Sequence, residues 1–380
     1  MEVKKLKECC TIIAGQSPES KYYNSNGDGL PFFQGKADFG ELYPSIRVYC
    51  SQPTKIAEKD DILLSVRAPV GPTNLAPCKV CIGRGLTAIR PSEVLLTRYV
   101  LLFFRYFEAQ LASKGTGTTF KAITQDVVKN LEIPIPPLPE QERIVARIEE
   151  LFSQLDAGVE TLKKTKAQLA VYRQAVLKEA FAVCKEYVAI ESVTQHVTDG
   201  DHMPPPKADN GIPFIMISNI KENAISWGNT AFVGRDYYDS IEPKRKPQNG
   251  DVLYTVTGSY GIPVLVDFNK EFCFQRHIAL LRPNDAIEQK YLYYSLMEPS
   301  VYAQATKGAT GTAQKTVGLG ILRKIEIPFI ENHSDQLRIV EAIESRLSVC
   351  DSIEQTVDTA LQQAEAMRQS ILKEAFEGTL

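Results

Sequence analysis

Apolar residues recur at alternating steps of three and four along two long stretches of the chain, 141–181 and 336–376. This spacing places them on one face of a helix. A 3.5-residue repeat that continues this far is typical of a coiled coil rather than of a helix on a globular surface. We predict that the two helices pair with each other, while two separate surface helices remain the alternative. The predicted seam consists of Ile144, Ile148, Leu151, Leu155, Leu162, Leu169, Ile339, Ile343, Ile353, Val357, Met367 and Ile371.

The two helical stretches are copies of each other. Residues 141–181 align without a gap on 336–376, with 17 of 41 positions identical, and both copies end in the sequence LKEAF. The segments before the helices repeat more loosely, since Asp61–Gly71 resembles Asp251–Gly261. Self-similarity on this scale indicates a chain built from two copies of one structural plan.

Outside the helical stretches, short β-rich runs alternate with turns rich in glycine and proline. This pattern predicts small, mainly β domains with one or two helices, for which Tyr99–Ser113 and Tyr291–Ala305 are the candidates. Ser334 can cap the second long helix. We therefore predict an α+β fold with a pseudo-twofold internal repeat. Its parts are a first mainly β domain, 1–135, a central helical region, 136–185, a second mainly β domain, 186–330, and a C-terminal helical region, 331–380.

The charge distribution leaves a nucleic-acid partner open. A formal net charge of −3 argues against such a partner when it is taken alone. However, the segments 138–185 and 331–380 together carry −5, so the remainder of the chain carries +2. A basic surface can therefore lie on the β domains, although so small an excess does not establish one.

Composition indicates a soluble protein, with 44% hydrophobic and 23% charged residues. The longest apolar stretch, Tyr99–Phe107, is broken by Arg105 and is shorter than the roughly 18 residues that a membrane-spanning helix needs. The first residues lack the apolar core of a signal peptide. We therefore expect no membrane partner, a cytoplasmic location and eight reduced cysteines.

The chain carries no recognisable catalytic signature. The glycine-rich stretches Gly115–Lys121 and Gly308–Lys315 do not have the spacing of a phosphate-binding loop, and the nucleophile motif G-x-S-x-G is missing. The pair Cys78 and Cys81 lacks the second pair that a structural zinc site needs. The cluster Asp-Gly-Asp-His at 199–202 is interpreted as a polar loop. We expect no catalytic residue, no metal and no cofactor.

The remaining motifs resemble those of the DNA specificity subunits of Type I restriction-modification systems. The resemblance covers essentially the whole chain, including the order of the motifs and their duplication. The motifs are RAPVG, CIGRGLTAIRP, GDVLYTVTGS, FQRHIALLRP, IPIPPLPEQERIVARIE and the repeated LKEAF.

This resemblance implies a non-catalytic protein whose two β domains are target recognition domains. In the family, each such domain reads one half of a split, asymmetric DNA sequence. The two helical regions pair antiparallel as a ruler and dock two methylation subunits. Restriction subunits join through the methylation complex, and the adenine methyltransferase and ATP-dependent endonuclease activities belong to these other subunits. The expected partners are therefore double-stranded DNA, two methylation subunits and, through them, restriction subunits.

Candidate DNA contacts are polar side chains on the loops of the β domains, because phosphates and base edges are bound by such donors. Each of these residues can instead be structural or solvated, and Arg67 and Arg84 can brace a loop by pairing with a carboxylate. The candidates are Gln34, Lys36, Arg67, Arg84, Lys121, Ser218, Asn219, Lys221, Ser259, Tyr260, Arg276, His277 and Lys315.

Two other functions remain as alternatives. One is a DNA-reading subunit of a different restriction or methylation enzyme, and the other is a coiled-coil scaffold that binds proteins only. Salt-dependent binding to duplex DNA separates the readers from the scaffold, because phosphate contacts release counterions.

Overall fold

The computed structural model describes residues 2–115 and 122–380, and the chain forms two compact units. Unit 1 contains residues 1–162 and 358–380, and unit 2 contains residues 163–357. Each unit therefore combines one mainly β domain with one part of each long helix. The predicted α+β fold with an internal repeat is confirmed.

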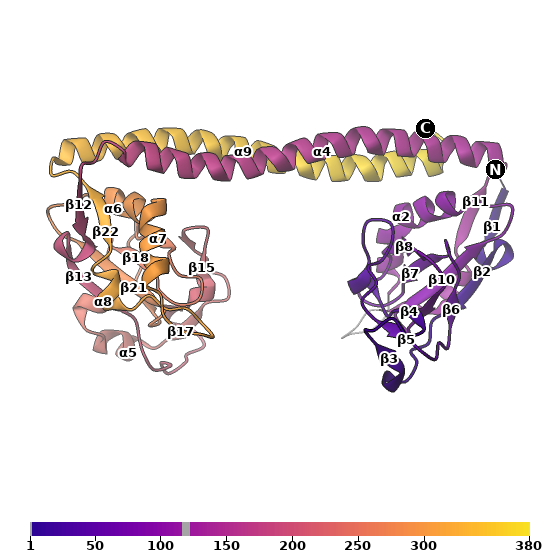
Figure 1. Cartoon of the computed structure of the whole chain (residues 1–380), viewed down its shortest axis with the longest axis horizontal. Coiled ribbons are helices and arrows are strands. Elements are labelled where there is room, and N and C mark those ends of the chain that lie inside the picture. The colour runs from indigo at the N-terminus through magenta and orange to yellow at the C-terminus, as the bar shows by residue number, and fades with distance from the viewer. Residues whose placement is uncertain (1, 116–121) are drawn as a thin grey trace. The chain divides into compact units, whose positions relative to one another are not determined.

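The described residues of the β domain in unit 1 form three sheets, whose strands are labelled in Figure 1. The four-stranded sheet has the order β2 (Cys10–Ala14), β10 (Leu86–Pro91), β7 (Ile62–Ser65) and β8 (Thr73–Leu75). The five-stranded sheet has the order β3 (Tyr23–Asn24), β5 (Tyr49–Cys50), β4 (Leu30–Phe33), β9 (Val80–Ile82) and β6 (Ile56–Ala57). The two-stranded sheet pairs β1 (Glu2–Lys5) with β11 (Glu132–Ile135).

Unit 2 repeats this plan. Its four-stranded sheet has the order β13 (Thr194–Asp199), β21 (Ile278–Pro283), β18 (Val252–Thr255) and β19 (Pro263–Leu265). A three-stranded sheet has the order β17 (Ala231–Val233), β14 (Ile212–Ile215) and β20 (Cys273–Phe274). The two-stranded sheets are β12 (Glu186–Ala189) with β22 (Glu326–Phe329), and β15 (Ile220–Lys221) with β16 (Ala224–Ile225).

Helices complete both units. The α-helices are α1 (Leu6–Cys9), α2 (Thr97–Ser113), α3 (Gln125–Lys129), α4 (Leu138–Phe181), α5 (Arg235–Ser240), α6 (Gln289–Leu296), α7 (Pro299–Gly308), α8 (Leu319–Leu322) and α9 (His333–Glu377). The short 3₁₀ helices are η1 (Ser20–Tyr22), η2 (Lys36–Asp38), η3 (Ile190–Ser192), η4 (Ile217–Asn219) and η5 (Pro243–Arg245). Across the described residues, none of these helices combines the length and apolar character that crossing a membrane requires.

The predicted helix within the first β domain is confirmed as α2, but the one predicted within the second is interrupted. The chain breaks between α6 and α7 because Pro299 has no N–H to continue the helical hydrogen bonds. The Glu298 carboxylate then accepts a hydrogen bond from Ser300 N at 2.8 Å and caps α7.

The central strands of unit 1 are buried on both faces. Along β7, Ile62 and Leu64 belong to a core that includes Tyr99 of α2, whereas Leu63 belongs to a second core with Phe33 of β4. Because side chains alternate along a strand, one face of this sheet packs against α2 and the other against the five-stranded sheet. Burial on both sides explains the continuous apolar run in the sequence.

The same alternation occurs in unit 2. Val252 and Tyr254 of β18 share a core with Tyr291 of α6, and Leu253 shares another core with Phe274 of β20. In each domain, a pair of parallel strands therefore packs against the four-stranded sheet. The pair is β4 with β9 in unit 1 and β14 with β20 in unit 2.

An ion pair with a buried aspartate fixes the start of the central strand in each domain. The guanidinium of Arg90 donates to both carboxylate oxygens of Asp61, each at 2.7 Å. Arg282 does the same to Asp251 in unit 2, at 2.9 and 2.8 Å. The repeated sequence pattern, an aspartate before one strand and an arginine near the end of the strand that pairs with it, therefore has a structural cause.

Buried or partly buried side chains recur every seven residues along both long helices, as in a coiled coil. They are Gln141, Ile148, Leu155, Leu162, Leu169 and Val176 in α4, and Gln336, Ile343, Cys350, Val357, Ala364 and Ile371 in α9. These positions are equivalent in the sequence repeat. Of the other predicted seam residues, Ile144 and Ile339 are buried and Leu151 is partly buried.

Two predicted seam residues, Ile353 and Met367, are exposed, at 40% and 54%. The seam passes instead through their neighbours Glu354 and Arg368, which are partly buried and form ion pairs with the other helix. The apolar character of Ile353 and Met367 was therefore misleading, because charged residues occupy the adjacent seam positions.

Within each unit, α4 and α9 lie side by side and run antiparallel (Figure 1). As residue numbers rise along α4, the numbers of their partners fall along α9. The cross-helix contacts include Arg143–Leu380 and Asp156–Arg368 in unit 1, and Arg173–Glu354 and Glu179–Arg346 in unit 2.

The first seam position of each helix is a buried glutamine. Gln141 is fully buried, accepts a hydrogen bond from Leu96 N at 2.8 Å, and donates to the carbonyls of Val94 and Pro136 at 2.8 and 2.9 Å. Gln336 makes the same three bonds in unit 2, with Glu288 N, Ala286 O and Ile330 O. Each glutamine thereby ties its long helix to the loop before α2 or α6.

The start of α9 differs from the prediction. Ser334 does not cap this helix, because it lies inside the first turn. Asn332 precedes the helix, and its side-chain oxygen accepts a hydrogen bond from Ser334 N at 2.8 Å. Both residue types are good caps, so the sequence alone did not decide between them.

Candidate nucleic-acid interface

A cleft of about 1050 Å³ opens at the ends of two parallel strands in unit 1. Strands β4 and β9 pair in parallel, with Phe32 opposite Cys81 and Phe33 opposite Ile82, so both chains leave the sheet at the same edge. The cleft is lined by Tyr23, Phe32, Gln34, Gly35, Lys36, Ala37, Asp38, Arg47, Val48, Ser65, Arg67, Ala68, Pro69, Arg84 and Gly85. We refer to it as cleft 1.

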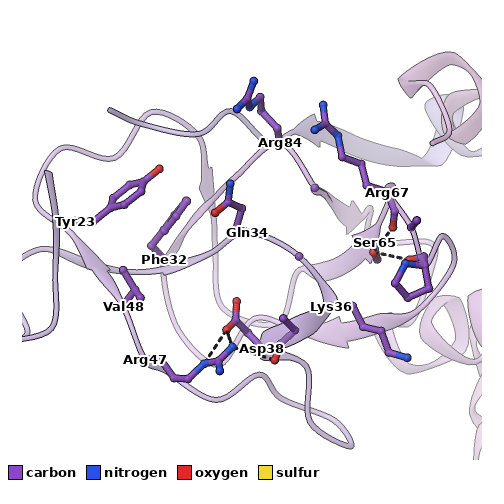
Figure 2. A pocket seen from close by; sticks show the side chains of 15 residues that line it. Tyr23, Phe32, Gln34, Lys36, Asp38, Arg47, Val48, Ser65, Arg67 and Arg84 are labelled. Carbon is purple, nitrogen blue, oxygen red and sulfur yellow. Dashed lines mark hydrogen bonds and ion pairs between the residues drawn. The ribbon is translucent and has the colours of Figure 1, made fainter. Parts of the chain in front are cut away.

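Four of the predicted DNA contacts in this domain meet in cleft 1. Gln34, Lys36, Arg67 and Arg84 come from three separate loops and are all exposed. Figure 2 shows Arg67 and Arg84 on one side of the cleft, with Gln34 between them and the Asp38–Arg47 pair. The fifth predicted contact, Lys121, lies outside the described residues.

Within the part of the chain that the structure describes, the two arginines do not brace loops through carboxylates. Among the described residues, the guanidinium groups of Arg67 and Arg84 form no hydrogen bond or ion pair. The bracing role belongs to Arg90, which holds Asp61, and to Arg47, whose Nε donates to Asp38 at 3.0 Å. No described residue therefore occupies the donors of the Arg67 and Arg84 guanidinium groups.

Cleft 1 is strongly basic. Its lining carries four basic side chains, Lys36, Arg47, Arg67 and Arg84, against the single carboxylate of Asp38. This local excess is hidden in the net charge of −3 because acidic residues are concentrated on α9. A concave basic surface attracts polyanions and raises their local concentration.

Aromatic side chains line another part of cleft 1. The ring of Tyr23 stacks on Phe32 with 4.7 Å between ring centroids, and its hydroxyl donates to Pro18 O at 2.8 Å. Burial raises the pKa of Tyr23, although the nearby charge of Arg84 opposes the rise. The phenol therefore stays protonated at neutral pH. Sequence reasoning missed Tyr23 and Arg47, because neither lies in a repeated motif.

Hydrogen bonds from the Ser65 side chain hold the loop that carries Arg67. The hydroxyl of Ser65 lies 2.8 Å from Pro69 O and 3.1 Å from Arg67 O, so it binds within the loop. In unit 2, the Thr255 hydroxyl donates to Ser259 O at 2.8 Å in the same way. Both loops are therefore preorganised without the use of the Arg67 or Ser259 side chain.

A second, smaller cleft occupies the equivalent place in unit 2. Strands β14 and β20 pair in parallel, with Phe214 opposite Cys273. The cleft measures about 410 Å³ and is lined by Asp201, His202, Met203, Pro204, Pro205, Lys207, Phe214, Met216, Ala231, Phe232, Gln275, Arg276 and His277. We refer to it as cleft 2. Of the predicted contacts in this domain, Arg276 and His277 line it.

Asn219, one of the predicted DNA contacts, is buried and has its side chain engaged within a turn. The residue is only 4% exposed. Its side-chain oxygen accepts from Met216 N at 3.0 Å, and its amide donates to Ser226 O at 3.3 Å. Asn219 therefore braces a turn, which an amide in a loop does as readily as it reads a base. Its neighbours Ser218 and Lys221 are exposed but do not line cleft 2.

The remaining predicted contacts lie outside cleft 2, on loops around the β18–β19 connection. Ser259 and Lys315 are exposed, and the Lys315 carbonyl accepts from Gly258 N at 2.9 Å. The Tyr260 ring stacks on Tyr302 with 5.8 Å between centroids. These loops offer hydroxyl and ammonium groups beside an exposed aromatic pair.

The Asp-Gly-Asp-His cluster is a hydrogen-bonded loop. Asp201 accepts from Tyr237 at 2.7 Å and pairs with Arg245 at 3.1 Å, while Asp199 lies 2.8 Å from His202 Nε2. Burial, followed by the Asp201 carboxylate, raises the pKa of Tyr237, which therefore remains a donor. Within the described ranges, no three His, Cys, Asp or Glu side chains form a group that could hold a metal.

Comparison with known proteins identifies a family. The family model described as type I restriction modification DNA specificity domain matches residues 1–170 and 199–363. The EcoKI specificity subunit of Escherichia coli is 24% identical over 336 residues, which are 80% of this chain and 70% of that protein. The putative MjaX specificity subunit of Methanocaldococcus jannaschii is 40% identical over 167 residues, 44% of this chain and 38% of that protein.

Solved structures share the fold. A chain from a type I R-M system studied for complex assembly and conformational transition gives a TM-score of 0.75 at 20% identity, covering 100% of this chain and 98% of that one. The HsdS subunit of Thermoanaerobacter tengcongensis gives a TM-score of 0.52 at 21% identity, covering 100% and 97%. At these identities the likeness concerns the fold alone.

Proposed function

We propose, from the premise that this chain belongs to the type I restriction modification DNA specificity family, that each of its two β domains reads one half of a split DNA sequence. The observation that carries this proposal is cleft 1. There, side chains from three loops converge, and the two guanidinium groups of Arg67 and Arg84 are not engaged by described residues. An open, basic, preorganised surface of this kind fits duplex DNA.

The residues of cleft 1 divide by chemistry into two roles. Gln34, Arg67 and Arg84 present planar amide or guanidinium donors that match the paired groups on purine edges. Lys36 offers a point charge and suits a phosphate, and Arg47, already paired with Asp38, suits the same role. Arg276 and His277 supply the donors of cleft 2. Further contacts are proposed for Ser218, Lys221, Ser259, Tyr260 and Lys315 in the second domain and for Lys121 in the first.

The proposed DNA sequence is split and not palindromic. Two identical readers related by a twofold axis would read inverted copies of one sequence. Here the lining of the two clefts differs, for example Gln34 against Met216 at the end of the equivalent strands. The heptad-patterned helices α4 and α9 are the element that sets the length of the unread spacer between the half-sequences.

The proposed partners are double-stranded DNA and two methylation subunits, which dock on the helical regions, with restriction subunits joining through them. The chain itself supplies recognition in the cytoplasm, and adenine methylation and ATP-dependent cleavage are activities of those other subunits. Methylation requires an adenine to be taken out of the stacked duplex, which a separate active site must then receive.

Replacement of Arg84 by alanine tests the role of cleft 1. We expect Arg84→Ala to weaken binding to the recognised duplex by about tenfold or more, because the lost guanidinium contacts a base or phosphate. Fluorescence anisotropy at fixed salt concentration measures the affinity. The matched control is Lys79→Ala, which removes one positive charge just before β9, at the opposite end of the same strand.

The control variant should bind within about twofold of the unchanged chain, since a distant surface charge is screened. Equal affinity of the Arg84→Ala variant and the unchanged chain would exclude cleft 1 as the reading surface. Binding that did not depend on salt would argue for a protein-only scaffold instead.

A further inference from the structure

The two clefts are built on equivalent positions but offer different chemistry. Phe32 and Phe214 occupy the same place in the parallel strand pairs, opposite Cys81 and Cys273. Two residues further along, Gln34 in cleft 1 corresponds to Met216 in cleft 2. An amide with two donors and one acceptor oxygen is thus replaced by a thioether that offers almost none.

One arginine is kept while its surroundings change. Arg84 and Arg276 follow the equivalent strands β9 and β20 at the same distance, and both are exposed. Both clefts contain the equivalent phenylalanine, Phe32 or Phe214, but cleft 1 adds basic and amide groups around its arginine, whereas cleft 2 adds Met203, Met216 and Phe232. We refer to Met203, Phe214, Met216 and Phe232 as the apolar wall of cleft 2, and to Lys207 and Arg276 as its basic rim.

Met203 is the most exposed side chain of this wall. It is 78% exposed, more than any other large apolar side chain among the described residues. Its segment is anchored by Asp201, which accepts a hydrogen bond from Tyr237 at 2.7 Å and pairs with Arg245 at 3.1 Å. An exposed methionine on an anchored segment at a cleft is a feature of binding surfaces, because thioether side chains adapt to apolar partners.

The charges of cleft 2 favour a nucleic acid over an apolar peptide. Lys207 and Arg276 line it together with two histidines, and the only carboxylate in the lining, Asp201, is already paired with Arg245. Among the four bases, thymine alone presents an apolar group, its C5 methyl, on the major-groove edge. An apolar wall inside a basic rim matches a thymine methyl flanked by phosphates.

We propose that cleft 2 selects its half-sequence through contact of Met203 and Met216 with a thymine C5 methyl group, and that cleft 1 reads its half-sequence through polar donors without such a contact. This inference rests on the proposed function and adds the chemical class of the ligand group. Arg276 and His277 bind the neighbouring purine edge or phosphate from the rim.

Replacing thymine by deoxyuridine tests the inference, because only the C5 methyl is lost. Duplexes carrying the sequence found by methylation mapping are made with deoxyuridine at each thymine position in turn, and their affinities for the full chain are measured. One thymine position in the second half-sequence should lose about fourfold in affinity, the value for one buried methyl or methylene group. Substitutions in the first half-sequence should leave the affinity within about twofold.

Methionine variants locate the contact. Met216→Ala and Met203→Ala should weaken binding to the thymine duplex but bind the thymine and deoxyuridine duplexes equally, because the partner of the methyl group is gone. The matched control, Met367→Ala, removes an exposed methionine from α9 and should retain the fourfold preference for thymine.

The outcomes separate the inference from the function on which it rests. Specific binding that is equally strong for thymine and deoxyuridine at every position overturns the inference and leaves the proposed function standing. Absence of any preference for the mapped sequence over unrelated DNA overturns the proposed function itself. The inference is also overturned if the methionine variants keep their preference for thymine. The same holds if these variants lose only assembly with the methylation subunits, because the apolar wall then serves another partner.

Discussion

Single residues explain why two domains with such different surfaces share one framework. The pairs Asp61–Arg90 and Asp251–Arg282 stand at equivalent places, and both aspartates are only 2% exposed. A buried carboxylate requires a partner, because an uncompensated charge in the interior is costly. These four residues are therefore constrained, while the side chains at the rims of the clefts are free to differ.

Loss of Arg282 should destabilise the protein strongly. Arg282→Ala leaves the Asp251 carboxylate buried without its partner, and we expect a loss of about 3 kcal/mol in the free energy of unfolding. Urea denaturation followed by circular dichroism measures this loss. Arg235→Ala is the control, since Arg235 pairs with Glu271 on the surface and should cost less than about 1 kcal/mol.

The cause of the loss can be isolated by a second substitution. The double variant Arg282→Ala with Asp251→Asn removes the stranded charge and should be more stable than Arg282→Ala alone. A double variant that is less stable than the single one would show that the penalty does not come from the unpaired carboxylate.

At the level of elements, a buried glutamine joins each long helix to its β domain. Gln141 and Gln336 are polar residues at seam positions that a coiled coil normally fills with apolar side chains. Two of the three hydrogen bonds of each glutamine satisfy backbone groups of the loop before α2 or α6. The repeat of a buried glutamine at the start of both helices thus links the orientation of each helix to the domain beside it.

Replacement of Gln141 by leucine should preserve the seam but loosen this junction. Gln141→Leu leaves the Leu96 N–H without its acceptor, and we expect a cost of about 1–3 kcal/mol and faster hydrogen exchange of that amide. Mass spectrometry of exchanged peptides measures the effect. Gln174→Leu changes an exposed position on the same helix and should leave exchange at Leu96 unchanged; equal protection in both variants would contradict the proposed junction.

Insertions should reveal the period of the helices. Four residues inserted between Gln154 and Leu169 add about 6 Å and nearly one full turn, so the seam is nearly restored. Two inserted residues rotate the seam by about 200° and should reduce stability or docking of the methylation subunits. Base pairs are about 3.4 Å apart, so the four-residue variant should widen the unread DNA spacer by at most one or two base pairs.

Methylation-site mapping distinguishes these outcomes. The four-residue variant should retain both half-sequences and change only their separation. An unchanged spacer with altered half-sequences would show that the helices do not set the distance.

At the scale of the whole molecule, the duplicated plan predicts that the two readers are independent. Replacing residues 1–135 by the equivalent domain of a relative should change one half-sequence and preserve the other, because each cleft lies within a single unit. Mapping of methylated sites in the host genome measures both halves at once. A change in both half-sequences would show that the readers are coupled.

The sequence predicted the repeat, the β character of both domains and the long helices because periodicity and self-similarity are properties of whole segments. The sequence also indicated Gln34, Lys36, Arg67 and Arg84 as candidates, because they lie in or next to motifs that the two copies share. The structure places all four in cleft 1. Single-residue errors arose where one residue type has two equally good uses. Asn219, predicted as a DNA contact, has its side-chain oxygen engaged in bracing a turn.

Residues outside the motifs could not be predicted from the sequence. Tyr23 and Arg47 reach cleft 1 only because the five-stranded sheet brings β3 and the chain before β5 beside the end of β4. The apolar wall of cleft 2 depends on where the Met203 segment is anchored, and that anchor is Asp201, which the sequence indicated only as part of a polar loop.

The composition of unit 1 has a consequence for synthesis on the ribosome. Ile371, Leu372 and Ala375 belong to the same core as Ile144 and Tyr99, so the last part of the chain completes the first domain. Unit 2 ends at Val357, so all of its residues leave the ribosome before Ile371, Leu372 and Ala375 do. Although chains are made from the N-terminus, the domain begun second is finished first. Until the last residues emerge, the part of the first core that Ile371, Leu372 and Ala375 later cover therefore stays open to solvent.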